Sequence, residues 1–354
     1  MAGVSDAVWS EEGTTPDRIE AALRELLVQR HAENDRYAPA RVLNMIVFVD
    51  RSWSGEIANR LSAVGRYHAS RLVMLEYEPR RERLDARVTI ASEGDLRSGE
   101  LELLRETVVV KLGEHHLDDV LTITDPLVVT DLPTLLWSPH GHEAVVRELL
   151  ELSQAVLVDS VDEPVAREAL EHACALSEHA YVVDLAWLRS MPWRERVAAA
   201  FDEPQLRDEL RTITSVSVRH HQASTAAALL LAGWLASRLG WRAAPMVAHD
   251  GTLLGKARAK GQDVDLRLQA APGLQVRGLE GVSIETAAGR QLRLDRSPGG
   301  LRACMRDAHS AQREWTILGA SRGETGILGE GIRQALLRDP TYVPALKAAQ
   351  AMAQ

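Results

Sequence analysis

Residues 42–49 read Val42-Leu43-Asn44-Met45-Ile46-Val47-Phe48-Val49, a nearly continuous apolar run. A short run of this kind, rich in β-branched side chains, is typical of a largely buried strand. Ile57, Leu61 and Val64 then recur at helical spacing, so a helix is expected to follow. A buried strand followed by a helix predicts an α/β layer in this part of the chain.

The same alternation of strand-like and helical patterns continues to about residue 160. Apolar residues at helical spacing also precede the first strand, which predicts a helix over residues 16–31. Further strands are expected at residues 71–77, 86–90, 107–112, 132–137 and 154–158, with a helix at 143–152. We therefore predict an α/β N-terminal domain, which ends near Glu163 and Pro164.

The second half of the chain has a different pattern. Residues 226–239 form an apolar helix that is expected to stop at Gly240 and Trp241 in a Schellman motif. Strand-like segments with glycine-containing turns follow at residues 244–248, 264–269, 273–277, 281–286 and 291–295. They predict an α+β C-terminal domain with an antiparallel sheet covered by helices. The predicted domains are a helical arm (1–40), the α/β domain (41–163), the α+β domain (164–310) and a helical tail (311–354).

Composition and charge limit the classes of protein to consider. The chain has 354 residues, of which 45% are hydrophobic and 26% charged, so a disordered or collagen-like chain is excluded. The net charge is −9, and residues 1–160 alone carry 28 acidic and 17 basic residues, a net charge of −11. This negative field repels nucleic acid and can steer a basic protein surface toward the chain. We therefore predict no nucleic-acid partner.

Cysteine content and hydropathy predict a cytoplasmic location. Cys174 and Cys304 are the only cysteines and form no CxxC motif, so neither a disulfide framework nor a structural zinc site is expected. The first thirty residues contain no signal-like apolar region, and the apolar stretch 226–236 is shorter than the ~20 residues that span a bilayer. We predict no membrane partner.

The motifs of common catalytic sites are missing from the sequence. Residues 51–55, after the first strand, contain no GxGxxG pattern, and neither a P-loop nor a GxSxG motif occurs elsewhere. His140 and His142 could face one side of an extended segment as metal ligands, but no third ligand stands at a suitable spacing. We therefore predict no catalytic residue, no cofactor and no metal, and we interpret these histidines as solvated loop residues.

Several short segments instead suggest contacts with another protein. In residues 131–137, Pro133 suits the start or edge of a strand, and Trp137 ends the run with a large amphipathic ring. Such side chains either pack in a core or anchor a partner, and the sequence leaves both readings open. The candidate interface residues are Asp131, Pro133, Trp137, Asp159, Ser160, Asp184, Trp187, Trp193 and Arg194.

Five segments along the chain carry a resemblance to a known family. They are Arg71-Leu72-Val73-Met74, Asp131-Leu132-Pro133-Thr134-Leu135-Leu136-Trp137, Val156-Leu157-Val158-Asp159-Ser160, Asp184-Leu185-Ala186-Trp187-Leu188-Arg189 with Trp193-Arg194, and Leu229-Leu230-Leu231-Ala232-Gly233-Trp234-Leu235-Ala236-Ser237-Arg238-Leu239-Gly240-Trp241. In this order and spacing, between about residues 42 and 300, they resemble the OpcA family of glucose-6-phosphate dehydrogenase assembly proteins.

The resemblance implies a function without catalysis. Members of that family bind glucose-6-phosphate dehydrogenase, which feeds the oxidative pentose phosphate pathway, and promote its active oligomeric form. A similar chain would be an assembly factor and allosteric activator. Two alternatives stay open. One is a sugar-phosphate-binding regulator or cryptic enzyme, with an anion near Asp159 and Ser160 or at the joint of residues 323–331. The other is a scaffold without effect on the rate.

Overall fold

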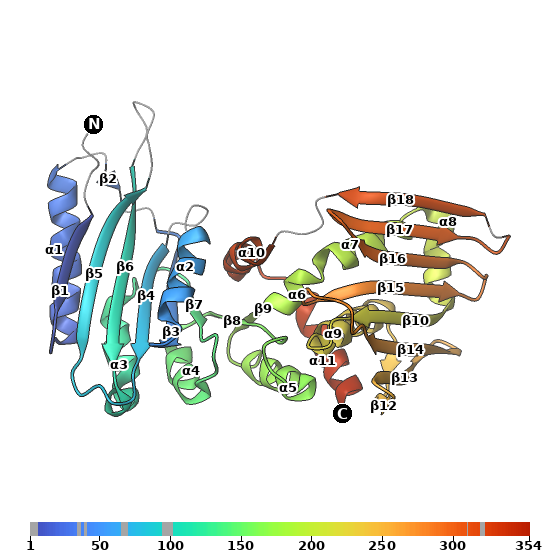
Figure 1. The fold of residues 1–354 in the computed structure, drawn as a ribbon, viewed down its shortest axis with the longest axis horizontal. Coiled ribbons are helices and arrows are strands. Elements are labelled where there is room, and N and C mark those ends of the chain that lie inside the picture. The colour runs from blue at the N-terminus through green and yellow to red at the C-terminus, as the bar shows by residue number, and fades with distance from the viewer. Residues whose placement is uncertain are drawn as a thin grey trace. The chain divides into compact units, whose positions relative to one another are not determined.

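The computed structural model of the chain contains two nine-stranded sheets (Figure 1). The structure describes residues 6–33, 37–38, 41–64, 70–93, 102–309, 311–318 and 323–354. Two compact units are formed, and neither is one continuous segment. The first unit comprises Met1–Val158, His179–Val183 and Leu328–Leu337; the second comprises Asp159–Glu178, Asp184–Ile327 and Arg338–Gln354.

The first unit is an α/β structure, as predicted. Its strands are β1 (Ala7–Glu11), β2 (Tyr37–Ala38), β3 (Leu43–Asp50), β4 (Ser70–Tyr77), β5 (Asp85–Glu93), β6 (Glu102–Leu112), β7 (Thr134–Trp137), β8 (Ala155–Val158) and β9 (Tyr181–Asp184), whose last residue belongs to the second unit. Its helices are α1 (Pro16–Glu33), α2 (Ser54–Val64), α3 (Val120–Thr124) and α4 (Glu143–Leu149), with 3₁₀ turns at Glu114–Asp119, Asp125–Leu127 and Leu150–Leu152. The predicted arm thus contributes β1 and α1 to this unit, and the predicted four-part division stays a prediction.

The centre of the first sheet is parallel. The strand order is β1-β5-β6-β4-β3-β7-β8-β9. Strands β6, β4, β3, β7 and β8 run parallel to one another, while β5 pairs antiparallel both with β6 and with β1. Residues 43–49 of β3 are all buried, which explains why the strand has no polar alternation apart from Asn44. The continuous apolar run at residues 42–49 therefore marks the centre of a sheet.

The second unit surrounds a second sheet. Its helices are α5 (Ala166–Leu176), α6 (Leu185–Arg189), α7 (Met191–Ala200), α8 (Pro204–Arg207), α9 (Thr225–Leu239) and α11 (Tyr342–Ala353), with a 3₁₀ turn at Asp208–Thr212; α10 (Gly323–Leu337) has residues in both units. Its strands are β10 (Ile213–His220), β11 (Arg242–Ala243), β12 (Val247–His249), β13 (Thr252–Ala259), β14 (Gln262–Ala270), β15 (Leu279–Thr286), β16 (Gln291–Ser297), β17 (Gly300–Arg306) and β18 (Gln312–Leu318).

The second sheet corrects the prediction of an antiparallel sheet. Strand β10 pairs with β14 in parallel, although the other pairings in the order β11-β13-β14-β10-β15-β16-β17-β18 are antiparallel. The reason is that α9 follows β10 and carries the chain back before β13 and β14 form, whereas alternating side chains alone do not distinguish the two directions. The sheet is therefore mixed. The strand expected at residues 273–277 is wrong, because this segment has no strand and connects β14 to β15.

Helix α9 packs closely against α11, and a glycine permits this approach. A Cβ on Gly233 would lie 2.3 Å from the carbonyl oxygen of Ala345 and 2.8 Å from the amide nitrogen of Ala349. The helix ends as predicted, since Gly240 has a φ of 67° and the Trp241 amide donates to the carbonyl of Ala236 at 2.9 Å. The apolar sequence of α9 thus reflects burial against both a helix and a sheet.

Candidate functional site

A buried hydrogen-bond cluster in the second unit gathers several of the predicted interface residues. Asp184 is fully buried at the N-terminus of α6, where its Oδ1 accepts from the Ala186 amide at 2.9 Å and the Ser160 amide at 3.2 Å. Its Oδ2 accepts from the Ser160 hydroxyl at 2.6 Å and the Tyr342 hydroxyl at 3.1 Å. Asp184 thus joins three segments that are distant in the sequence. Ser160 donates its hydroxyl proton to this carboxylate, so its side chain is engaged within the cluster.

The pKa of Asp184 is raised from 3.8 to about 6. Burial is the largest cause and the charge of Asp159 adds to it, while the hydrogen bonds from Ser160 and Ala186 oppose it. The pKa of Asp184 is higher in the folded chain than in the unfolded chain. Asp184 therefore contributes its full share to the free energy of unfolding below its unfolded pKa, and this share is lost as the pH rises through about 6. The cluster is therefore most stable when this carboxyl group is protonated.

Replacing Asp184 by Asn is expected to remove this pH dependence. The amide keeps the oxygen that the Ser160 and Ala186 amides bind, and its nitrogen can donate to the two hydroxyl oxygens. Between pH 4 and pH 7, the stability of the wild-type chain relative to Asp184→Asn should fall by about 2.4 kcal/mol, which is most of the value of this pKa shift at 1.36 kcal/mol per pKa unit. Hydrogen exchange of α6 and α11 at several pH values measures this difference. An unchanged difference across that range would contradict the assignment.

Trp187 and Arg194 form a second layer of the same cluster. The Trp187 indole donates to Asp339 Oδ2 at 2.8 Å, and its ring meets Tyr342 edge-on at 5.5 Å. The Arg194 guanidinium lies 3.4 Å from the centre of the Trp187 ring and donates to the Trp187 carbonyl at 3.2 Å. Burial lowers the pKa of Arg194 to about 10, although Asp339 and Glu195 oppose this, so the group stays charged at neutral pH. Stacking on the indole compensates part of the lost hydration.

An ion pair extends the cluster through Asp159. Arg189 donates to both carboxylate oxygens of Asp159, at 2.8 and 2.7 Å, and also to Glu324 at 3.1 and 2.7 Å. Burial by itself lowers the pKa of Arg189, but the bonds to Asp159 and Glu324 raise it above its ordinary value. The Asp159 carboxylate and the Ser160 hydroxyl are therefore both engaged within the chain. The alternative anion site at these two residues would have to displace these bonds.

In the first unit, the segment that contains Asp131 is held by a residue that the sequence analysis missed. Asn44 is fully buried in β3; its amide nitrogen donates to the Val129 carbonyl at 2.9 Å, and its oxygen accepts from the Val129 amide at 3.0 Å. Trp137 is buried at the end of β7, whereas Asp131 and Pro133 are exposed. The sequence signal was the single polar residue within the apolar run 42–49.

Burial divides the nine predicted interface residues into two groups. Asp131 and Pro133 are on the surface of the first unit, so their assignment to an interface stays a prediction. The other residues lie inside one of the units, where their side chains are buried or, for Asp159, almost so, and they can shape a surface but expose little of themselves: Trp137, Asp159, Ser160, Asp184, Trp187, Trp193 and Arg194. Of the nine predicted interface residues, only Asp131 and Pro133 are therefore exposed enough to contact a partner directly.

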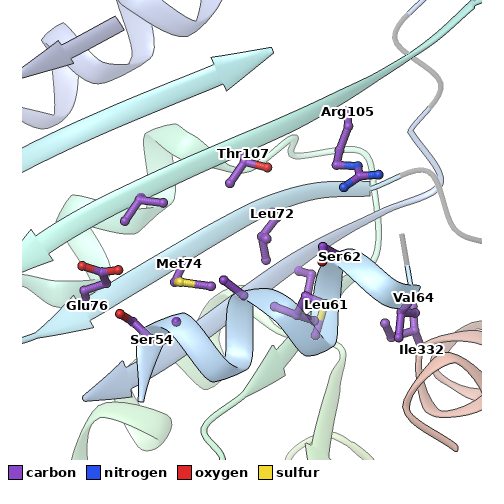
Figure 2. A pocket seen from close by; sticks show the side chains of 14 residues that line it. Ser54, Leu61, Ser62, Val64, Leu72, Met74, Glu76, Arg105, Thr107 and Ile332 are labelled. Carbon is purple, nitrogen blue, oxygen red and sulfur yellow. The ribbon is translucent and has the colours of Figure 1, made fainter. Parts of the chain in front are cut away.

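A groove on the first unit is lined mainly by apolar atoms (Figure 2). Its volume is about 320 Å³, and α2 forms one side of it while β4 and β6 form its floor. Leu72, Met74 and Thr107 line the floor, and Glu76 is near one end. The buried-to-half-buried alternation along residues 104–112 shows that one face of β6 is packed and the other is partly open. This groove is an apolar cavity with a few polar groups, a form typical of binding sites.

The two loop histidines have local partners. His142 Nε2 lies 3.0 Å from Asp50 Oδ1, and the ring of His140 lies 5.2 Å from that of Trp53. Across the part of the chain that the structure describes, no three His, Cys, Asp or Glu side chains are grouped as metal ligands. Over the same residues, every helix is too short or too polar to cross a bilayer.

Known proteins match this chain over separate regions. "Putative OxPP cycle protein OpcA" of Synechococcus elongatus is 30% identical over 142 residues, which cover 39% of this chain and 32% of that protein. The protein of the same name from Nostoc punctiforme is 34% identical over 120 residues, which cover 33% of this chain and 26% of that protein. The chain thus aligns with about a third of the length of these curated relatives.

Solved structures show a weaker likeness. An oxidoreductase domain protein from Kribbella flavida has a TM-score of 0.46 and 14% identity, with coverage of 86% of this chain and 93% of that chain. The WlbA dehydrogenase from Thermus thermophilus has a TM-score of 0.44 and 15% identity, with coverage of 88% and 95%. At these values the likeness says nothing about the activity of this chain.

Family models cover most of the sequence. Residues 61–175 match the model described as the glucose-6-phosphate dehydrogenase subunit N-terminal domain. Residues 180–346 match the model described as the C-terminal domain of the same subunit. Because the two matches follow each other in order over well more than half of its length, the chain belongs to the OpcA family of glucose-6-phosphate dehydrogenase assembly proteins.

Proposed function

We propose that this chain is a non-catalytic assembly factor that binds glucose-6-phosphate dehydrogenase and favours its active oligomeric form. The observation that carries the proposal is the pair of family matches over residues 61–175 and 180–346, both described as parts of a subunit of that enzyme. The names of the cyanobacterial relatives, which refer to the OxPP cycle, support a place in the oxidative pentose phosphate pathway.

We further propose that the dehydrogenase docks on the open side of the first sheet. Parallel strands are normally covered on both faces, because their side chains are apolar on both. Thr107 and Val109 of β6 are only half-buried, and the groove beside them is lined by Leu72 and Met74 of β4. A partner that covered this face would complete the packing that the unit leaves unfinished. Apolar area removed from water contributes roughly 25 cal/mol per Å² to such an association.

Charge supports a basic partner surface. Residues 1–160, nearly all of the first unit, carry a net charge of −11. Such a field increases the rate at which a basic surface is encountered, and the increase falls with ionic strength. We therefore propose that the face of the dehydrogenase that meets the first unit is basic.

Activation requires only a difference in binding strength. A factor that binds the active oligomer more tightly than the inactive form shifts the population toward it, without contributing a reacting group. Couplings of this kind are typically about 1–3 kcal/mol, which corresponds to a 5- to 150-fold change. The buried Asp184 cluster would give the second unit the rigidity that such selective binding needs.

The test is a titration of the full chain into the dehydrogenase of the same organism, with initial rate and particle mass followed together. We expect a larger oligomer and a lower apparent KM. Complex formation without a change of rate would instead support a scaffold. No change in either quantity at micromolar excess, or turnover of a sugar phosphate by the chain alone, would contradict the proposal.

A further inference from the structure

We propose that a groove in the second unit, between α7–α8 and the β16–β18 region, binds a small phosphate ester that carries a ring. The groove has a volume of about 640 Å³ and is lined mainly by polar atoms, in contrast to the apolar groove of the first unit. Its volume lies within the range of small-molecule sites, roughly 300–1,000 Å³. Neither the family matches nor the proposed docking face assigns it a role.

Arg196 of α7 provides the first argument for an anion. Its Nε is buried and has no hydrogen-bond partner among the residues that the structure describes. A buried donor without a partner costs about 1–3 kcal/mol, so a small movement of this half-buried side chain that brought the donor to an anion in the groove would remove that cost. Trp193 and Val197 of the same helix are buried, while Arg196, Ala199 and Ala200 line the groove. The helix therefore presents Arg196 to the groove by its periodicity.

Arg313 of β18 provides a second positive charge. It is exposed, lies over the ring of Trp315 with 5.6 Å between the guanidinium carbon and the ring centre, and forms no ion pair within the described ranges. Arg196 and Arg313 both line the groove. Two guanidinium groups from different elements can bind the several oxygens of a phosphate, whereas a single carboxylate offers only two oxygens.

The other charged groups around the groove are already paired or solvated. Arg290 donates through Nε to both oxygens of Glu209 at 3.0 Å, which fixes its position and neutralises part of its charge. Asp307 accepts from the amides of His309 and Ala311 at 2.9 and 3.0 Å, so its Oδ1 is directed into its own turn. Glu203 is exposed. The groove therefore has two arginines without a described ion pair, Arg196 and Arg313, and two carboxylates in the same condition, of which Asp307 is hydrogen-bonded in its own turn and Glu203 is exposed.

Trp315 and Met305 supply the surface for a ring. Both line the groove, and Trp315 is half-buried. An indole face stacks on a base or on the apolar face of a sugar, and a thioether adapts to either. The side chains of Gln205 and Gln312 add donors and acceptors for hydroxyl or base atoms. A charged end and an aromatic wall together favour a phosphate ester over inorganic phosphate.

Calorimetric titration of the full chain, without the dehydrogenase, tests the inference. The probes are glucose 6-phosphate, AMP, inorganic phosphate and glucose. We expect one of the two phosphate esters to bind, inorganic phosphate to bind at least about tenfold more weakly, and glucose not to bind. Which ester binds distinguishes a sugar phosphate from a nucleotide. Because the dehydrogenase is absent, a failure here leaves the assembly proposal untouched.

Two variants locate the site. Arg196→Gln and Arg313→Gln should each weaken binding of the ester about 10- to 100-fold, since each loses a charge-assisted hydrogen bond. Arg313 is exposed, so its replacement should leave folding unchanged even if Arg196→Gln is less stable. Arg238→Gln, at an exposed position of α9 outside the groove, is the matched control and should bind as the wild type does.

Three results would overturn the inference. The first is that neither ester binds at millimolar concentration, and the second is that both groove variants bind the ester as tightly as the wild type does. The third is that an acidic peptide such as hexaglutamate binds with the same arginine dependence while the esters do not. The last result would assign the groove to an acidic protein segment.

Discussion

Replacing Thr107 by Glu should weaken binding of the dehydrogenase about a hundredfold. Thr107 is half-buried on β6, directly beside Leu72 of β4 and Thr89 of β5, and it lines the apolar groove. The groove is lined mainly by apolar atoms, so the part of the partner that enters it is expected to be apolar, with the basic groups around it. The new carboxylate then loses its hydration without gaining a cation. A loss of ~3 kcal/mol is a modest value for such a group and corresponds to about two factors of ten in Kd.

The control for this variant is Thr316→Glu on β18. Thr316 is an exposed strand residue of the second unit and pairs with Arg302 across the sheet, so a carboxylate is tolerated there. Fluorescence titration of each variant with the dehydrogenase compares the two, and hydrogen exchange of β6 checks that Thr107→Glu is folded. Equal affinities for Thr107→Glu and Thr316→Glu would exclude the open face of the first sheet as the docking surface.

Most of the strands could be predicted because the burial of their side chains follows a simple pattern along the sequence. Residues 42–49 are apolar throughout because β3 is at the centre of a parallel sheet, and α9 is apolar because it packs on α11 and on the second sheet. The direction of β14 relative to β10 was not predictable in the same way. Strands with alternating burial have the same pattern in either direction, and only the crossover through α9 decides it.

The candidate sites were harder to predict because residue type does not show whether a side chain is packed inside the unit or exposed to a partner. Only its burial in the folded chain shows this. Trp187 and Arg194 have the composition of an interface, yet they stack on each other inside the second unit. Asn44 was not among the predicted site residues, yet its side chain binds Val129 in the segment before β7. Arg196 and Arg313 are 117 positions apart in the sequence and line one groove only after folding. Residues so far apart in the sequence cannot be recognised as neighbours from the local periodicity of the chain.

The charge pair Arg71–Glu106 is another feature that the sequence pattern did not predict. The two residues are direct neighbours in the parallel pairing of β4 and β6, and the Arg71 Nε donates to Glu106 at 2.7 Å. Glu106 is fully buried and also accepts from Arg41, while Arg71 donates to the Leu127 carbonyl at 3.2 Å. Burial lowers the pKa of Arg71, and Glu106 opposes that shift. The charge of Arg71 is thus supported by Glu106.

Glu106→Ala should therefore destabilise the first unit by about 3–5 kcal/mol, because it leaves Arg71 buried without its carboxylate. The double variant Arg71→Met with Glu106→Leu removes both buried charges and leaves Arg41, whose side chain is partly exposed and can be hydrated. It should recover most of this loss, since apolar replacements of buried pairs are often neutral. Hydrogen exchange of β4 and β6 in the full chain reports both values. Glu314→Ala, which breaks the exposed pair with Arg302, is the control and should change little. If the double variant were as unstable as Glu106→Ala, the cost would come from packing and not from an unpaired charge.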